Sequence, residues 1–268
     1  MGAYLLDLAL EQEIIDKLAA GSKSERLTPD EIESLADITF AFTVTAVEDQ
    51  PNQPVTSYLA ARGSNGCTHL VVDLPIQDQL VDATLGRVNP KGTVYNFETI
   101  RDLANEDVFR DRCFGLIIRS KPTVDSAMLA LSPGQIWSLR EFGQLNPTFD
   151  LDLSKASSEK VECSMQDREG TSRIYLVGRP SDEVLPPNLR PDLAAQIKAF
   201  FEIETVKACV LQDARSGSKA LLTYNVFFKD PAEIQRSAAF LRALHPPNYR
   251  LALLDEADRA LEQYMFKL

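Results

Sequence analysis

The chain has 268 residues, with 28 Lys or Arg against 39 Asp or Glu, so its formal net charge is −11. This acidic balance argues against direct binding of nucleic acid, which requires a basic face. No apolar run reaches the roughly 18 residues of a membrane span, so we expect no membrane association. The hydrophobic content of 44% is typical of one large or two ordinary globular domains.

The first half of the chain alternates predicted helices and strands. Apolar residues near one face, Leu5, Leu8, Ile15 and Leu18, predict a helix over 4–19. A capping box at Thr28-Pro29-Asp30-Glu31 predicts a second helix to about Asp37. We expect strands at 38–47, 55–62, 68–74, 93–96, 113–119 and 126–131, and helices at 76–85, 97–110 and, capped by Ser132, 133–142.

A polar stretch from Asn146 to Glu159 indicates a domain boundary. We therefore predict an acidic α+β domain with N-terminal helices at 1–150, a linker at 151–159 and a second α+β domain at 160–268. The second domain should contain a hairpin at 160–166 and 172–178, helix 190–202, a hairpin at 205–213 and 219–228, helix 231–243, strand 249–254 and helix 256–266. The order ββ-αββαβ-α of the second domain is α+β, and we predict two α/β-sandwich-like domains with largely antiparallel sheets.

Four segments of the second domain carry a family resemblance. They are Ile174-Tyr-Leu-Val-Gly-Arg-Pro180, the helix from Leu193 to Phe201, Val206-Lys-Ala-Cys-Val-Leu211 and the closing Tyr264-Met-Phe266. Through them, residues 172–266 resemble the C-terminal domain of the SseB-type (enhanced serine sensitivity) proteins of bacteria. The resemblance implies an α+β fold and a non-catalytic protein, and it transfers no site residue.

The sequence contains few residues suited to catalysis or metal binding. Its cysteines, Cys67, Cys113, Cys163 and Cys209, lie between 40 and 50 residues apart without a Cys-x-x-Cys pair. We interpret them as reduced thiols in a cytoplasmic protein. Neither His69 nor His245 has metal-ligand spacing, so we predict no metal and no cofactor. On a strand, however, Cys67 and His69 share one face, which leaves a nucleophilic pair open.

Negative charge is concentrated in the first half of the chain. Residues 1–155 hold 23 acidic and 13 basic side chains, whereas residues 156–268 hold 16 and 15. Glu98, Asp102 and Glu106 recur every four residues and would line one face of the helix predicted at 97–110, as Asp78 and Asp82 would on the preceding helix. These five carboxylates form either a solvated face or a docking surface for a basic protein.

The leading hypothesis is therefore a non-enzymatic, cytoplasmic bacterial protein that binds a basic protein partner. An immunity or antitoxin-like role, or a regulatory one, suits an acidic chain with few catalytic groups. One alternative is a thiol-dependent enzyme of the sulfur-transfer type, with Cys67 or Cys113 as nucleophile. Another is a regulator that binds a small molecule between the two domains.

Overall fold

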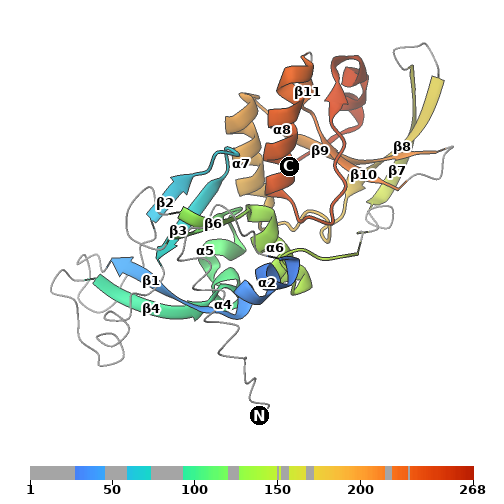
Figure 1. Cartoon of the computed structure of the whole chain (residues 1–268). Coiled ribbons are helices and arrows are strands. Elements are labelled where there is room, and N and C mark those ends of the chain that lie inside the picture. Colours follow the sequence, from blue (N-terminus) through green and yellow to red (C-terminus); the bar gives the residue numbers. More distant parts are fainter. Residues whose placement is uncertain are drawn as a thin grey trace. The chain divides into compact units, whose positions relative to one another are not determined.

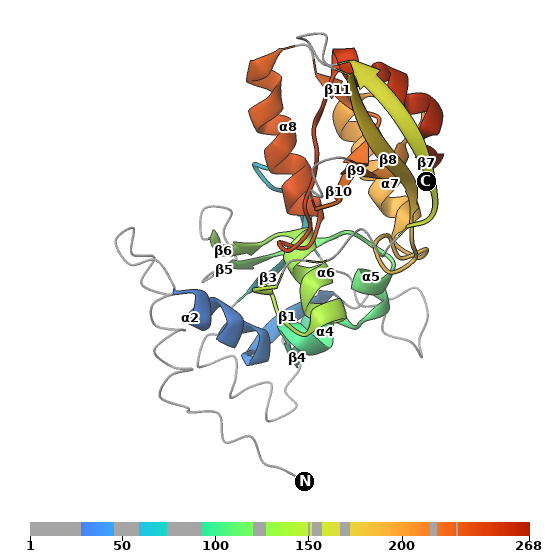
Figure 2. The ribbon, with the colours of Figure 1, turned by 90° about the vertical axis from the view of Figure 1, so that its right-hand side faces the viewer.

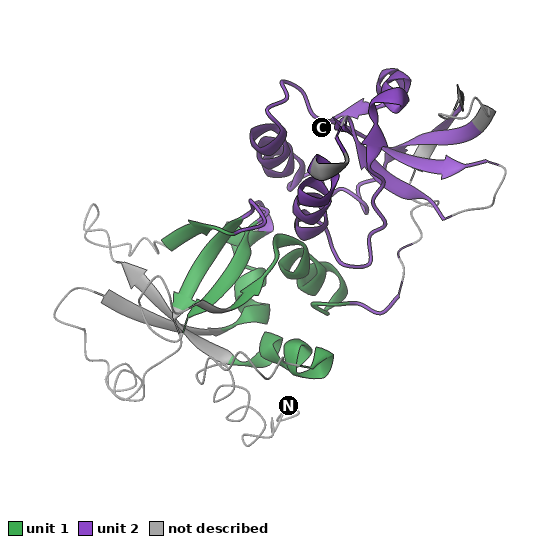
Figure 3. Ribbon diagram, turned by 45° about the horizontal axis from the view of Figure 1, so that its top comes forward, with its two compact units in different colours: residues 1–63, 68–109, 114–146 green, residues 64–67, 110–113, 147–268 purple. Residues whose placement is uncertain are grey.

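A computed structural model of the chain describes residues 28–45, 59–73, 93–119, 127–149, 151, 157–166, 172–214, 219–228 and 230–268. The chain forms two compact units (Figure 3). Unit 1 comprises Met1–Gly63, Thr68–Phe109 and Phe114–Asn146, and unit 2 comprises Ser64–Cys67, Arg110–Cys113 and Pro147–Leu268. The helices predicted at 4–19 and 76–85 and most of the predicted linker lie outside the described residues.

Unit 1 is an α+β unit built on a mostly antiparallel sheet (Figure 1). Its strands follow the order β4-β1-β3-β5-β6, with β2 also paired to β3, and β3 and β5 are the parallel neighbours. The elements are α2 (Pro29–Ser34), η1 (Leu35–Asp37), β1 (Thr39–Thr45), β2 (Leu59–Arg62), β3 (Thr68–Asp73), β4 (Thr93–Thr99), α4 (Ile100–Ala104), α5 (Asp107–Arg110), β5 (Gly115–Arg119), β6 (Ala127–Leu131) and α6 (Pro133–Phe142).

The core of unit 1 lies between one face of this sheet and the helices of the unit. Figure 2 shows α2, α4, α5 and α6 beside the strands. Leu70 and Val72 of β3 and Leu116 and Ile118 of β5 alternate along their strands and are buried, as a strand with one core-facing side requires. The helices supply Leu35, Ala36, Ile100, Leu103, Ala104, Phe109, Ile136 and Leu139 to the same cluster. Burial of this apolar surface is the main stabilising term of the unit.

The two helix caps predicted in unit 1 are confirmed. Thr28 caps α2 with Pro29 in its first turn, and Glu31 accepts a hydrogen bond from the Thr28 backbone N–H in return. Ser132 caps α6, and with Gln135 it forms the same reciprocal pair. These signals were readable because a cap depends on residues three positions apart in the sequence.

The helix predicted over 97–110 begins later than expected and is interrupted. Residues up to Thr99 belong to β4, where Glu98 pairs with Phe40 of β1. The helix begins only at Ile100, with Thr99 as its N-cap, and the segment is divided into two short helices, α4 and α5. Pairing with a strand far away in the chain overrides the local helical pattern here, which no short window of sequence reveals.

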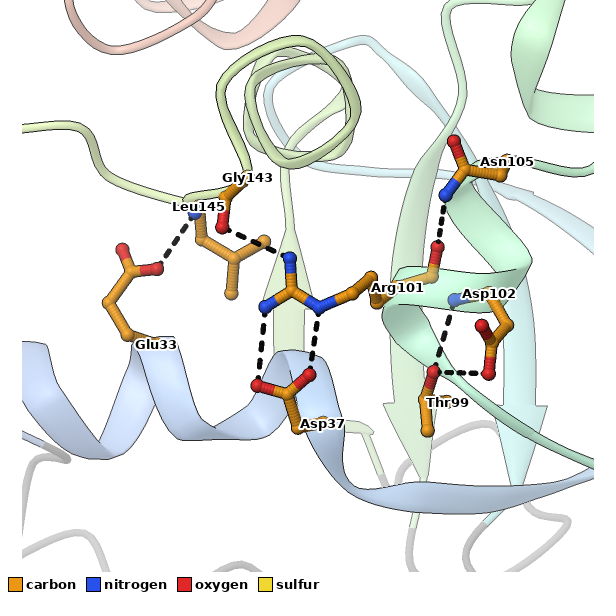
Figure 4. A network of polar contacts seen from close by, with 8 residues as sticks. All are labelled: Glu33, Asp37, Thr99, Arg101, Asp102, Asn105, Gly143 and Leu145. Carbon is orange, nitrogen blue, oxygen red and sulfur yellow. Dashed lines mark hydrogen bonds and ion pairs between the residues drawn. The ribbon is translucent and has the colours of Figure 1, made fainter. Parts of the chain in front are cut away.

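A half-buried ion pair joins three segments of unit 1 (Figure 4). Arg101 donates from Nε and Nη2 to the two carboxylate oxygens of Asp37, at 2.8 and 3.2 Å, and from Nη1 to the carbonyl of Gly143, at 3.1 Å. Glu33 accepts from the backbone N–H groups of Leu145 and Asn146. The contacts connect η1, α4 and the chain after α6, and the hydrogen bond to Asp37 raises the pKa of Arg101.

Unit 2 is a second α+β unit with an antiparallel sheet of order β10-β9-β8-β7 and β13 paired to β9. Its elements are β7 (Ser157–Gln166), β8 (Ser172–Pro180), α7 (Arg190–Phe201), β9 (Lys207–Asp213), β10 (Leu221–Tyr224), β11 (Phe227–Phe228), α8 (Pro231–Leu244), β12 (Leu254–Asp255), η4 (Glu256–Tyr264) and β13 (Phe266–Lys267). The two hairpins and the helices predicted at 190–202 and 231–243 are confirmed.

Three details of unit 2 differ from the sequence prediction. The strand expected over 219–228 ends at Tyr224, and Phe227 and Phe228 pair in parallel with β12 instead of continuing the hairpin. The last helix is a 3₁₀ helix, and Phe266 leaves it to join β9. Residues 249–254 form only an isolated bridge, Leu222 to Leu251, and the start of β12.

We expect Arg101→Lys to lower the free energy of unfolding of unit 1 by about 1 kcal/mol. An ammonium group lacks the planar fork that reaches both oxygens of Asp37 and the Gly143 carbonyl together, and partial exposure keeps the effect small. Urea unfolding followed by the fluorescence of Trp137, the single and buried tryptophan in α6, measures it. The control is Arg110→Lys, because Arg110 belongs to unit 2 and its Nε lies 3.9 Å from the Asp111 carboxylate with both side chains 55% exposed. Equal midpoints for Arg101→Lys and the unchanged chain would contradict the prediction.

Candidate functional site

The structure places the three described carboxylates of the predicted acidic face on different elements. Glu98 lies in β4, Asp102 in the first turn of α4 and Glu106 in the turn that follows α4, so they do not share one helix face. Asp78 and Asp82 lie outside the described residues. Asp102 is exposed and completes the cap of α4, since its carboxylate accepts from the Thr99 hydroxyl at 2.8 Å.

All four cysteines are buried, which works against a nucleophilic role. Burial raises the pKa of Cys209 to about 12. Around Cys113, Asp192 of α7 accepts from the Cys113 backbone N–H at 2.8 Å and from the Arg112 guanidinium at 3.1 Å, while Gln196 donates to the Cys113 carbonyl at 2.8 Å. The Arg112 guanidinium, the basic group next to Cys113 in the sequence, is therefore paired with a carboxylate, and the Cys113 thiol itself is buried.

Both histidines are buried side chains with structural surroundings. His69 of β3 pairs with Gly115 of β5, and a Cβ at position 115 would clash with the His69 ring. The Nδ1 of His245 lies 2.7 Å from the carbonyl of Leu241, so it carries the proton, and Nε2 accepts from the Tyr224 hydroxyl at 2.6 Å. Desolvation lowers the pKa of His245 to about 4, which keeps the ring neutral in this pair.

A cavity of about 470 Å³ lies within unit 2 and was not anticipated from the sequence. Its lining residues come from the end of α7, the turn between β10 and β11, the first two turns of α8, and η4. Figure 1 labels α7, α8, β10 and β11. Its apolar walls are Phe200, Phe201, Ile203, Val226, Phe227 and Phe228. A volume of this size lies within the range of small-molecule sites, about 300–1,000 Å³.

Aromatic contacts hold the walls in place. Phe200 stacks on Phe240 with ring centroids 3.8 Å apart, and Phe201 packs edge-on against both rings. Gly66, which unit 2 takes from the first half of the chain, packs on Phe200 with φ +86°, and a Cβ there would lie 2.6 Å from the Phe200 ring. The close approach and the positive φ together require glycine.

Polar and charged side chains also line the cavity. The guanidinium of Arg236 lies over Phe200 and that of Arg259 over Phe227, at 5.3 and 4.9 Å from the ring centroids. Arg259 also forms a bidentate pair with Glu256, at 2.7 and 3.0 Å. Glu202 and Glu233 complete the lining as exposed carboxylates. The cavity lining therefore combines aromatic rings with polar groups and with charged groups of both signs.

The sequence held one usable signal for this cavity. Phe200-Phe201 and Phe227-Phe228 are pairs of adjacent aromatic residues, each at the end of a predicted helix or strand, which marks a concentration of apolar surface there. The charged residues of the lining come from α7, α8 and η4, which are far apart in the chain, so sequence spacing could not predict that they meet.

No protein-family model, curated protein or solved structure matches the chain. Among the described residues, His, Cys, Asp and Glu side chains nowhere gather in threes that could hold a metal ion. Within the same ranges, none of the helices combines the length and apolar character that a membrane crossing requires.

We expect the four thiols of the native chain to react with iodoacetamide more slowly than free cysteine, because each is buried. Addition of denaturant should release all four to the free-thiol rate. Mass spectrometry of the labelled peptides identifies each site, and rapid native labelling of Cys67 or Cys113 would restore the thiol-enzyme alternative.

The buried His245 should make the stability of unit 2 depend on pH. Its pKa falls from 6.5 to about 4 on folding, so between these values the unfolded chain binds the extra proton. The contribution is fully present above about pH 6.5 and is lost as pH falls toward 4, by about 3 kcal/mol in total. Unfolding by urea, followed by circular dichroism from pH 7 to 4, measures the slope. His245→Gln should flatten it, and an unchanged slope would contradict the assignment.

Proposed function

We propose that the chain is a non-enzymatic protein that binds a basic partner protein through the acidic surface of unit 1. An immunity or antitoxin-like protein, or a regulatory factor, is the class that fits. The resemblance of residues 172–266 to the SseB-type C-terminal domain stays a prediction and supports the same non-catalytic reading.

The observation that carries the proposal is how the charges of unit 1 are distributed. The guanidinium groups of Arg101 and Arg140 lie 2.8 and 3.0 Å from carboxylates of the same unit, those of Asp37 and Glu141. These two cations are therefore paired within the fold. Residues 1–155, which include all of unit 1, carry 23 acidic against 13 basic side chains. An uncompensated field of this kind accelerates association with a cationic protein and selects against acidic ones.

The state of the nucleophilic side chains also supports a binding role. Cys67, Cys113, His69 and His245 were the groups from which a catalytic site could be assembled, and each is buried in packing. A catalytic base must reach a substrate proton, and His245 already uses both ring nitrogens within the fold.

The cavity of unit 2 favours a second candidate function, a regulator that responds to a small molecule. The sequence placed such a ligand between two domains, whereas every residue that lines the cavity belongs to unit 2.

The test is a pull-down from the native host with the tagged full chain, eluted in rising salt. Asp102→Asn combined with Glu106→Gln removes two charges. The side-chain carbonyl that the first substitution leaves at position 102 can still accept from the Thr99 hydroxyl, so α4 keeps its cap. We expect one stoichiometric basic partner, released from this variant at lower salt and bound several-fold more weakly.

The matched control removes two exposed carboxylates from unit 2, by Glu183→Gln with Glu204→Gln. It should leave the elution profile unchanged. If both double variants shift equally, the effect follows net charge and not the surface of unit 1, and if no partner is retained the proposal fails.

A further inference from the structure

We infer that the cavity of unit 2 binds a small amphipathic zwitterion, an α-amino acid with an aromatic or branched apolar side chain. The inference rests on the second candidate function and names the chemical class of its ligand. Three features carry it: the apolar walls, a cation at one helix end and a carboxylate at another.

The apolar part of the ligand is defined by the walls. Four phenylalanine rings, Ile203 and Val226 line about 470 Å³. The Phe201 ring packs edge-to-face against the rings of Phe200 and Phe228, which fixes their orientation before a ligand enters. A preformed site of this kind gains affinity from an apolar side chain without first having to order its own residues.

The carboxylate end is assigned to Arg236. This residue lies in the second turn of α8, a helix of 14 residues whose first turns, at its positive dipole end, contribute to the cavity lining. Its guanidinium rests on Phe200 and forms no ion pair with any residue in the described ranges. Arg259, by contrast, is already bound to Glu256. Arg236 therefore has a planar fork available for a carboxylate.

The ammonium end is assigned to Glu202, with Glu233 also on the lining. Glu202 is the C-cap of α7, at the negative end of a 12-residue helix. Its φ is +54°, and it is the one non-glycine residue with positive φ among those the structure describes. Glycine is the usual residue at this position of a helix end, so a glutamate there is conformationally unfavourable, and such strain is concentrated at functional sites.

Both charges on the ligand are needed to match these groups. A simple carboxylic acid would face the Glu202 and Glu233 carboxylates, and a simple amine would face Arg236. An α-amino acid offers both charges from one carbon atom, for Arg236 and a lining carboxylate, and leaves its side chain for the phenylalanines.

The experiment compares three probes by calorimetric titration of the full chain: L-phenylalanine, 3-phenylpropionate, which lacks the ammonium, and 2-phenylethylamine, which lacks the carboxylate. We expect phenylalanine to bind at least tenfold more tightly than either analogue. Arg236→Gln should abolish the preference for phenylalanine over the amine, and Glu233→Gln should weaken phenylalanine but not phenylpropionate.

Glu202→Gly separates a binding role from a structural one. Because glycine adopts positive φ without strain, this variant should raise the melting temperature by about 2 °C while weakening phenylalanine at least fivefold. Glu204→Gln, two residues further on and outside the cavity lining, is the matched control and should change neither.

Two outcomes would overturn the inference, and they differ in whether the second candidate function survives. If 3-phenylpropionate binds as tightly as phenylalanine, the cavity takes a ligand of another class and the second candidate function survives. If none of the three probes binds, both the ligand class and that candidate function fail.

Discussion

The stacking of Phe200 on Phe240 is the contact on which the cavity of unit 2 depends. The rings are nearly parallel, at 5°, and join the last turn of α7 to the second half of α8. Because Phe201 packs against both rings, the two helices are held together by an aromatic cluster and not by long, flexible side chains. Glu202 ends α7 and Arg236 lies in α8, so the aromatic contacts that hold these two helices together also fix where the two charges lie.

Local signals predicted much of the fold, and non-local pairing accounts for where they failed. The caps at Thr28 and Ser132 and the helices α7 and α8 depend on residues within one or two turns, and all four were found from sequence. The segment 97–99 has an equally helical pattern, yet it pairs with β1. Similarly, Phe227 and Phe228 leave the predicted hairpin for β12, which lies beyond α8 in the chain.

The candidate sites were less accessible to sequence reasoning than the fold. The predicted acidic face required Glu98, Asp102 and Glu106 to share a helix, whereas α4 begins only at Ile100 and already ends at Ala104. The charges around the cavity come from α7, α8 and η4, and the conformation of Glu202 is visible only in its backbone angle. Composition did reveal the excess negative charge of the first half of the chain, because summed charge needs no geometry.

Unit 2 is not encoded by one continuous stretch of sequence. Gly66 packs on Phe200, and Asp192 and Gln196 bind the backbone of Cys113, so two segments from the first half complete it. A fragment beginning at Pro147 would lose these contacts and uncover the Phe200 ring, an apolar surface that favours aggregation. The C-terminal half is therefore a poor unit of genetic exchange: fusion or recombination that cuts at the polar stretch after Asn146 transfers an incomplete module.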